Sequence, residues 1–252
     1  AWSVLLNGVP CIELSHQAAV VHPLAPKPSE KSTFGRYVLQ HYAPSRQKYG
    51  FHFKSYDERV FTPVIRHEIR NAQPSDQGHY TVYLPGYHDD VLMHFLRQFD
   101  VKWEVFSKHA KYAYRVDNVF IEPISQLRFQ QSLINSTGVL CGAGFELPSE
   151  ALFLGKNTMV IPMKGHYEQT CNALGAADVG ATTIPELDLI YHRQINYWLG
   201  QQQQVPLLFA DQTEQIIIDI LNAFQKEGRA AYEPGVEFET LRQKLGLLRY
   251  FF

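Results

Sequence analysis

The sequence predicts an α/β protein with a Rossmann-like domain over residues 80–210, preceded over residues 1–70 by the C-terminal part of a second α/β domain. From residue 80 onward short apolar runs alternate with amphipathic runs, and the hydrophobic period switches between them as it does in βα repeats. Residues 1–70 lack this regular succession of strand-like and helix-like runs. Between the two, the polar, turn-forming segment 71–79 is typical of a linker.

The elements of the Rossmann-like domain follow from local patterns. Strands are predicted at short apolar runs between turn formers, and helices where apolar residues recur three and four positions apart. The predicted strands are 80–84, 102–106, 118–121, 138–141, 158–162 and 181–183. The predicted helices are 89–99, 124–134, 148–154, 168–177 and 185–199. The last helix would carry Glu186 and Asp188 in its first turn, where acidic residues favour the helix dipole. This order of elements is typical of a doubly wound sheet.

Patterns near the two ends of the chain predict the elements of the second α/β domain. Residues 5–14 have the pattern of a helix end, a Gly-Pro turn and a strand, and residues 51–66 contain alternating apolar positions. We expect Asp211 to cap an amphipathic helix that continues to about residue 226. The segment 211–252 should then pack back toward the first domain. Because the chain starts at Ala1 in what resembles the middle of a helix, we expect a fragment of a longer protein.

Composition limits the possible functions. The 252 residues are 45% hydrophobic and 19% charged, as in ordinary globular proteins. A formal net charge of -2 leaves no basic excess for a broad nucleic-acid surface. No apolar run approaches the roughly 18 residues that span a bilayer, so we expect at most peripheral membrane contact. Three cysteines without zinc-site spacing indicate reduced thiols and a cytoplasmic protein.

A glycine-rich turn after the fourth predicted strand is the main indication of a ligand site. Gly142 and Gly144 allow a ligand to approach the backbone, and the helix behind Pro148 offers N–H groups and a positive dipole end to an anion. A phosphate group suits this position. The turn lacks the Lys and Ser/Thr of a P-loop, which disfavours Mg-nucleotide hydrolysis. Glycines also serve ordinary tight turns between a strand and a helix.

Three polar residues near the same edge of the predicted sheet could bind a sugar. Glu150 lies about one turn inside the helix, where its carboxylate could accept both hydroxyls of a ribose. Glu168 and Gln169 open the next helix and could hydrogen-bond the hydroxyls of a second sugar. Acidic residues are also common in first helical turns, so the combination carries more weight than any single residue.

These residues resemble, in order and spacing, the nucleotide-sugar-dependent glycosyltransferases of the GT-B fold, a family that includes the UDP-N-acetylglucosamine transferases that make lipid II. The family pattern is a glycine-rich turn, a Glu near the helix start, a strand ending in Pro, and an acidic or polar residue with Gln before Asn-Ala. The matching positions are 141–144, 149–151, 160–162, 168–169 and 172–173.

The resemblance implies a hexosyltransferase-type enzyme that moves a sugar from a UDP-sugar to an acceptor, with no cofactor and no bound metal. It implies that Glu150 holds the ribose and that Glu168, in place of the Asp of many relatives, contacts the donor sugar with Gln169. The uracil would lie at Ile124. The positions implied for the diphosphate are Gly142, Gly144, Phe145, Glu146 and Leu147. Gly86, in a turn that departs from the Gly-Gly-Ser-like turn of many relatives, would face the diphosphate, and His166 would touch the sugar or phosphate.

The resemblance also assigns residues 1–70 to the acceptor-side domain, with residues 62–65 as its last strand. Inverting transfer needs a general base, and His16 is the candidate near the cleft, although a lone His after a strand is commonly a local hydrogen-bonding residue. Because much of the acceptor-side domain is expected to be missing, we expect this chain alone to transfer little. A UDP-N-acetylglucosamine 2-epimerase and a noncatalytic sugar-nucleotide-binding module remain alternatives.

Overall fold

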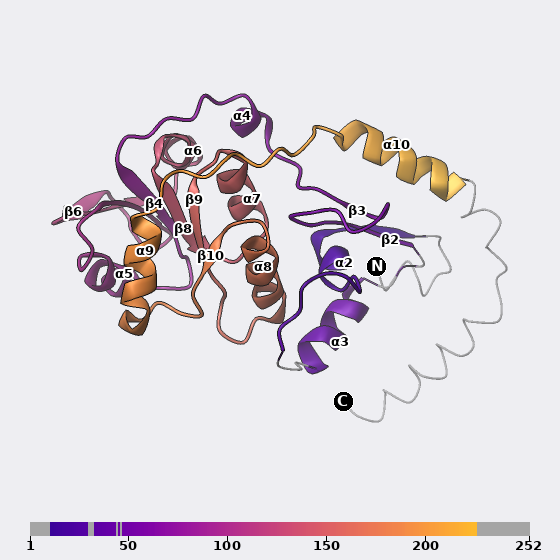
Figure 1. Cartoon of the computed structure of the whole chain (residues 1–252), viewed down its shortest axis with the longest axis horizontal. Helices are drawn as coiled ribbons and strands as arrows, with labels where there is room; N and C mark the ends of the chain where they lie inside the picture. Colours follow the sequence, from indigo (N-terminus) through magenta and orange to yellow (C-terminus); the bar gives the residue numbers. More distant parts are fainter. Residues whose placement is uncertain (1–10, 30–32, 44, 46, 226–252) are drawn as a thin grey trace.

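The computed structural model of the chain describes residues 11–29, 33–43, 45 and 47–225, and these residues form two sheets (Figure 1). The predicted features at residues 5–10 and 226–252 lie outside them. The smaller sheet has the order β1-β2-β3, and the larger has the order β10-β9-β8-β4-β5-β7-β6. Among the described residues, no helix has both the length and the apolar character needed to cross a membrane.

The larger sheet has the strand order of a Rossmann fold. Its strands are β4 (His79–Tyr83), β5 (Lys102–Ser107), β6 (Tyr114–Val116), β7 (Val119–Pro123), β8 (Gly138–Gly142), β9 (Asn157–Ile161) and β10 (Thr182–Thr183). The six parallel strands, numbered along the chain, lie in the order 3-2-1-4-5-6, and β6 adds an antiparallel edge strand on β7. The predicted Rossmann-like α/β fold is therefore confirmed, whereas β6 was not predicted.

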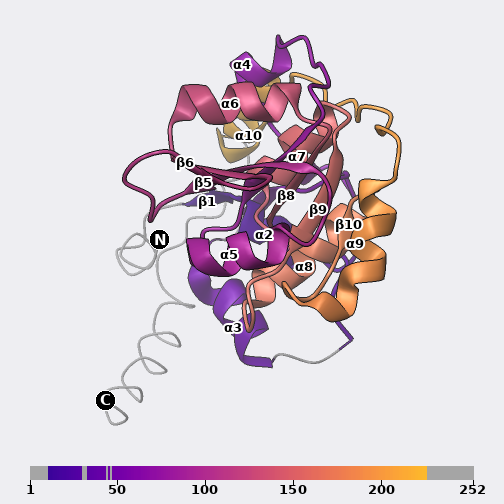
Figure 2. The same ribbon diagram turned by 90° about the vertical axis from the view of Figure 1, so that its left-hand side faces the viewer.

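Helices cover both faces of the larger sheet. One face packs against α5 (Asp89–Leu96) and α9 (His192–Leu199) around the buried rings of Trp103 and Trp198. The other packs against α6 (Gln126–Asn135), α7 (Glu146–Phe153) and α8 (Tyr167–Ala177). Figure 2 shows α5 and α6 on opposite sides of the sheet. Alternate residues of β8 point to the two faces, with Leu140 in the first core and Cys141 in the second.

The smaller sheet consists of three parallel strands, β1 (Ile12–Leu14), β2 (Gln47–Phe51) and β3 (Val60–Phe61). The short helix α2 (His16–Val20) packs on β2 so closely that a Cβ atom built on Gly50 would lie 2.5 Å from the backbone nitrogen of Ala19. A second helix, α3 (Thr33–Tyr42), follows. The strand predicted at 62–65 is wrong, since β3 ends at Phe61. Pro63, which has no N–H to donate, comes two residues later.

Segment 71–79, the expected linker, is held against the larger sheet's domain after the short helix α4 (His67–Arg70). The backbone of Ser75 donates to the carbonyl of Ile134 at 3.1 Å. The buried Lys156 Nζ donates to the carbonyl oxygens of Ser75 and Ser136 at 2.6 and 2.7 Å. Burial lowers the pKa of Lys156 to about 8. Two of these hydrogen bonds are made by the backbone of Ser75 and fix the middle of this segment.

After α9 the chain returns as an extended segment to α10 (Thr213–Ala223). Arg70 donates to the carbonyl of Phe209 at 2.8 Å and holds this return segment beside α4. Ile220 of α10 and the strand residues Tyr49 and Phe61 border one hollow, so α10 lies beside the smaller sheet (Figure 1).

Two predictions about helix starts are wrong. The helix predicted from residue 185 begins at His192, because the Asp188 side chain accepts a hydrogen bond from the Ile190 backbone and caps a separate 3-10 turn at Leu189–Tyr191. Asp211 does not cap α10 either. The N-cap position is Gln212, and Asp211 faces Arg70 with a 3.8 Å separation between oxygen and nitrogen.

Candidate functional site

The site begins where the strand order of the larger sheet reverses, between β4 and β8. Open α/β sheets bind ligands outside the carboxyl ends of the strands at such a point. Tyr83 pairs with Cys141, so the turns that follow these two strands are neighbours, and they contain Gly86 and Gly144. A Cβ atom built on either glycine would meet no atom within 4 Å. There is therefore room above both turns for a ligand to touch the backbone.

The first turn of α7 stands at the end of the glycine-rich turn. The helix begins at Glu146, two residues before the predicted start, and Phe145 in the N-cap position makes no side-chain cap. The N–H groups of Glu146 and Leu147 have no acceptor within the helix, because first-turn donors never do. Pro148 is tolerated in this turn since it has no N–H to lose. The arrangement favours an anion, whereas the carboxylate of Glu146 opposes one.

His16 connects the smaller sheet to the glycine-rich turn. Its ring stacks on Phe145, with centroids 4.0 Å apart and planes inclined by 11°. His16 Nδ1 lies 2.8 Å from the carbonyl of Phe51, and Nε2 lies 2.7 Å from Asn172 Oδ1. Asn172 in turn donates to the carbonyl of Ala143 at 3.2 Å. One imidazole therefore bridges β2, α8 and the turn after β8.

This arrangement gives His16 no free nitrogen with which to take a proton from an acceptor, as a general base must. Both neighbours of the ring are oxygen atoms, so a neutral imidazole donates to only one of them. Burial lowers the pKa of His16, against the hydrogen bonds to Phe51 and Asn172 and the charges of Glu168 and Glu146. In this conformation His16 positions the glycine-rich turn.

A second histidine, His52, packs between the two bodies and was missed by the sequence analysis. It is fully buried, shares a hydrogen bond of 3.0 Å between its Nδ1 and the Tyr56 hydroxyl, and lies against Gly175 of α8. Burial lowers its pKa to about 3, with the charges of His16, Lys54 and His22 adding to the effect. Gly175 could have revealed this contact from the sequence, because a glycine inside a predicted helix indicates that another residue packs closely against the helix.

Glu150, the residue expected to hold a ribose, is paired with Arg66. Arg66 Nε and Nη2 donate to the two carboxylate oxygens at 2.5 and 2.6 Å. The side chain of Glu150 is 4% exposed and that of Arg66 is 44% exposed. Both oxygens of the expected ribose contact are therefore occupied in this conformation. The sequence analysis missed Arg66, although a buried carboxylate requires a partner and could have prompted a search for one.

The start of α8 gathers the three residues predicted to face the donor sugar. His166 occupies the N-cap position, and its Nδ1 accepts from the backbone of Gln169 at 3.3 Å. The side chain of Gln169 accepts from the backbone of Met163 at 2.8 Å. Glu168 accepts from Gln17 of α2 at 3.4 Å. Gln169 therefore braces its own loop, while Glu168 faces the first body.

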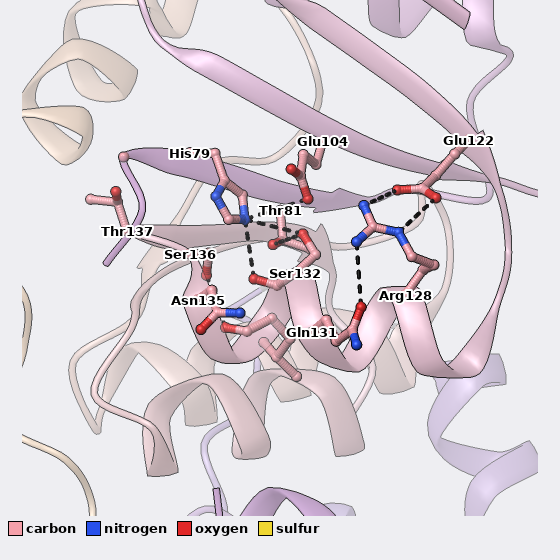
Figure 3. Close-up of polar contacts among 12 residues, drawn as sticks. His79, Thr81, Glu104, Glu122, Arg128, Gln131, Ser132, Asn135, Ser136 and Thr137 are labelled. Carbon is pink, nitrogen blue, oxygen red and sulfur yellow. Dashed lines mark hydrogen bonds and ion pairs between the residues drawn. The ribbon is translucent and has the colours of Figure 1, made fainter. Parts of the chain in front are cut away.

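Ile124 lies after β7 and is 48% exposed as a residue. The turn that contains it is braced by Arg128 of α6, whose guanidinium contacts the buried carboxylate of Glu122 at 3.2 and 3.4 Å (Figure 3). Arg128 also donates to Gln131 at 3.4 Å. Ile124 thus stands on a fixed turn at the same edge of the sheet as Gly86 and Gly144.

Figure 3 also shows a polar cluster that the sequence analysis did not single out. His79 Nε2 lies 3.2 Å from Ser132 Oγ and 3.5 Å from Glu104 Oε2, and Thr81 bonds to Ser132 at 2.7 Å. These residue types occur in hydrolase triads, but a triad uses a different ring nitrogen for each partner. Here one nitrogen faces both, beneath α6, and the cluster belongs to the core. Within the described ranges, no three His, Cys, Asp or Glu side chains are grouped to hold a metal ion.

One protein-family model matches most of the chain. The family model for glycosyl transferase family 1 matches residues 9–201. The chain is similar to the solved structure of Acinetobacter baumannii MurG, with a TM-score of 0.47 and 17% identity over 88% of this chain and 69% of that one. It is also similar to a glycotransferase of kitacinnamycin, with a TM-score of 0.46 and 14% identity over 79% of this chain and 64% of that one. For the spinosyn forosaminyltransferase SpnP the TM-score is 0.45, with 10% identity over 87% and 68% of the two chains. A search of curated proteins finds no match.

Proposed function

Because the chain belongs to glycosyl transferase family 1, we propose that it binds a UDP-sugar and serves transfer of the sugar to an acceptor without a bound metal. The observation that carries the proposal is the open space over Gly144, beside the first turn of α7 and at the reversal of a Rossmann strand order. A diphosphate in that space would accept hydrogen bonds from backbone N–H groups.

We assign the parts of the donor along this edge of the sheet. The diphosphate would lie over the turn from Gly142 to Leu147, with Gly86 on its other side. The uracil would contact the backbone at Ile124. The ribose would reach Glu150 once Arg66 moves aside, and the sugar would lie toward the start of α8, where His166, Glu168 and Gln169 gather.

The proposed chemistry rests on the charge of the leaving group. As the glycosidic bond breaks, negative charge grows on the diphosphate, and donors held in place before the reaction stabilise the transition state more than the ground state. The backbone N–H groups of Glu146 and Leu147 would serve this purpose. No protein carboxylate is needed as a metal ligand in such a scheme.

The position of His16 favours a second candidate, a module that binds the nucleotide sugar without transferring the sugar. Both His16 nitrogens face acceptors, so the predicted base is engaged elsewhere. We therefore propose that the 252-residue chain binds the donor and transfers little sugar. A 2-epimerase is the other alternative and would turn over the UDP-sugar without any acceptor.

Calorimetry with UDP, followed by assays of UDP release from a panel of UDP-sugars in EDTA, tests these proposals. Binding of UDP, with release that depends on an added acceptor, supports the transferase. Binding without release supports the module, and acceptor-independent conversion of the sugar supports the epimerase. Activity abolished by EDTA and restored by Mn²⁺ would contradict the metal-free route, and absence of UDP binding would contradict the donor site.

A further inference from the structure

The pair between Arg66 and Glu150 closes the position proposed for the ribose. Each carboxylate oxygen of Glu150 accepts a short hydrogen bond from the guanidinium, at 2.5 and 2.6 Å. Each oxygen keeps a second lone pair, but only 4% of the Glu150 side chain is exposed while the pair is in place, so a ribose cannot reach both oxygens until the guanidinium moves. Breaking the pair without replacing it would leave the nearly buried charge of Glu150 unpaired, which is unfavourable. A ligand at this site must therefore supply new partners for both groups.

Arg66 lies close to the place proposed for the diphosphate. It immediately precedes α4, and the neighbouring Ile65 and Ile69 pack in the same core as α7, while the pair with Glu150 leaves nearly half of the Arg66 side chain exposed. The hydrogen bond to Glu150, and the charges of Glu150, Glu68 and Glu146, raise the pKa of Arg66. Glu150, which the guanidinium contacts, lies about one turn after Glu146, where α7 begins, so the guanidinium stands near the helix end with the unpaired N–H groups.

We propose that Arg66 is a donor-site residue that exchanges partners, pairing with Glu150 in the empty site and with the diphosphate when a ribose occupies Glu150. This inference rests on the proposed function, because it requires the nucleotide at the assigned position. The two hydroxyls of a ribose can donate to the two carboxylate oxygens that Arg66 leaves. The planar guanidinium can then present its paired N–H groups to a phosphate, a geometry that Lys does not reproduce.

The exchange makes the site select for the diphosphate. Uridine offers hydroxyls to Glu150 but no anion to Arg66, so its binding separates the pair and leaves the guanidinium with water. UDP supplies an anion for Arg66, which also offsets the repulsion between the diphosphate and Glu146. Arg66 therefore favours UDP over uridine twice, once by attracting UDP and once by competing with uridine for Glu150.

Affinities for uridine and UDP, measured by calorimetry on the whole chain and on Arg66→Gln, test the exchange. We expect Arg66→Gln to bind uridine at least as tightly as the wild type and to bind UDP about ten- to a hundredfold more weakly, the range for loss of hydrogen bonds to a charged group. Arg97→Gln is the matched control. Arg97 also pairs with a carboxylate, Asp117 at 2.6 Å, and its side chain is 46% exposed. Its removal should change neither affinity.

Two further variants keep the test independent of folding. Arg66→Gln combined with Glu150→Gln replaces both charges, and it should show the same fall in the preference for UDP over uridine even where Arg66→Gln alone unfolds. Arg66→Lys should restore only part of that preference. If Arg66→Gln lost affinity for uridine and UDP equally, or kept its affinity for UDP, the exchange would be overturned. The proposed donor site would not be affected by that result. Wild-type protein that binds neither uridine nor UDP would overturn the proposed function and the exchange with it.

Discussion

Replacing Gly175 by Ala tests the contact between the two bodies. Gly175 lies inside α8, where Ala is the better helix former by about 1 kcal/mol, so the substitution would stabilise an isolated helix. In this protein a Cβ atom at Gly175 would stand 3.0 Å from His52 Nε2 and 3.2 Å from Phe53 Cδ2, with His52 Cε1 closer still. The His52 ring cannot turn away without losing its hydrogen bond with Tyr56.

Two opposite effects on stability are therefore expected in Gly175→Ala: a gain from the higher helix propensity of Ala and a loss from the overpacked contact with His52. Overpacking a buried contact costs about 1–3 kcal/mol, which exceeds the gain in helix propensity. We expect Gly175→Ala to lower the free energy of unfolding by roughly 1 kcal/mol and to lower the melting temperature by about 2–4 °C. In a His52→Ala background the clash is absent, and the same substitution should stabilise the protein by up to about 1 kcal/mol.

Urea unfolding of the four proteins in this double-mutant cycle measures the coupling. Gly200→Ala is the control, because the built Cβ there meets its nearest atoms at ordinary distances of 3.5 and 3.6 Å. That variant should be neutral or slightly more stable than the wild type. Gly175→Ala that is as stable as the wild type, or that destabilises equally in both backgrounds, would refute the reasoning.

Three further predictions concern the site and the linker. Gly144→Val should fold normally, because its side chain enters open space, yet bind UDP at least about tenfold more weakly by calorimetry; unchanged affinity would contradict the phosphate position. Because burial lowers the pKa of His52 from 6.5 to about 3, the folded state binds fewer protons, so stability is fully present above pH 6.5 and falls as the pH drops toward 3. Urea unfolding should show a shallower fall in His52→Leu, and equal slopes would contradict this. Lys156→Met leaves the carbonyls of Ser75 and of the buried Ser136 without their donor and should cost about 1–3 kcal/mol, with faster proteolysis near Ser75; an uncut segment would contradict its anchoring.

Hydrophobic periodicity predicted the large sheet well, because each of its strands and helices buries apolar residues that recur at a regular spacing within that element. The predicted strands 102–106 and 138–141 differ from β5 and β8 by a single residue at one end. Periodicity failed where one capping contact decides the backbone. Asp188 was read as a first-turn residue of a helix, but its side chain caps a 3-10 turn, and no hydrophobic pattern distinguishes these two roles.

The candidate site was harder to predict because its key contacts join residues that are far apart in the sequence. Glu150 was recognised by its place in a helix, whereas Arg66, its partner, is 84 residues away. His16 and Asn172 are separated by 156 residues. A single sequence shows which groups can form hydrogen bonds, but the packing of two bodies decides which of them meet. The motif therefore located the edge of the sheet, while the partners of its residues came from the structure.

The return of the chain from α9 to α10 has a consequence for how the protein is made. A ribosome releases β2 and β3 early, yet α10, which lies beside them, emerges only after the whole larger sheet. The bond between Arg70 and the carbonyl of Phe209 spans 139 residues, and contacts of such long sequence separation form slowly. We expect the smaller sheet to wait, partly uncovered, while its neighbour folds during synthesis. The nascent chain is then most exposed to aggregation at β1, β2 and β3, whose surroundings are completed last.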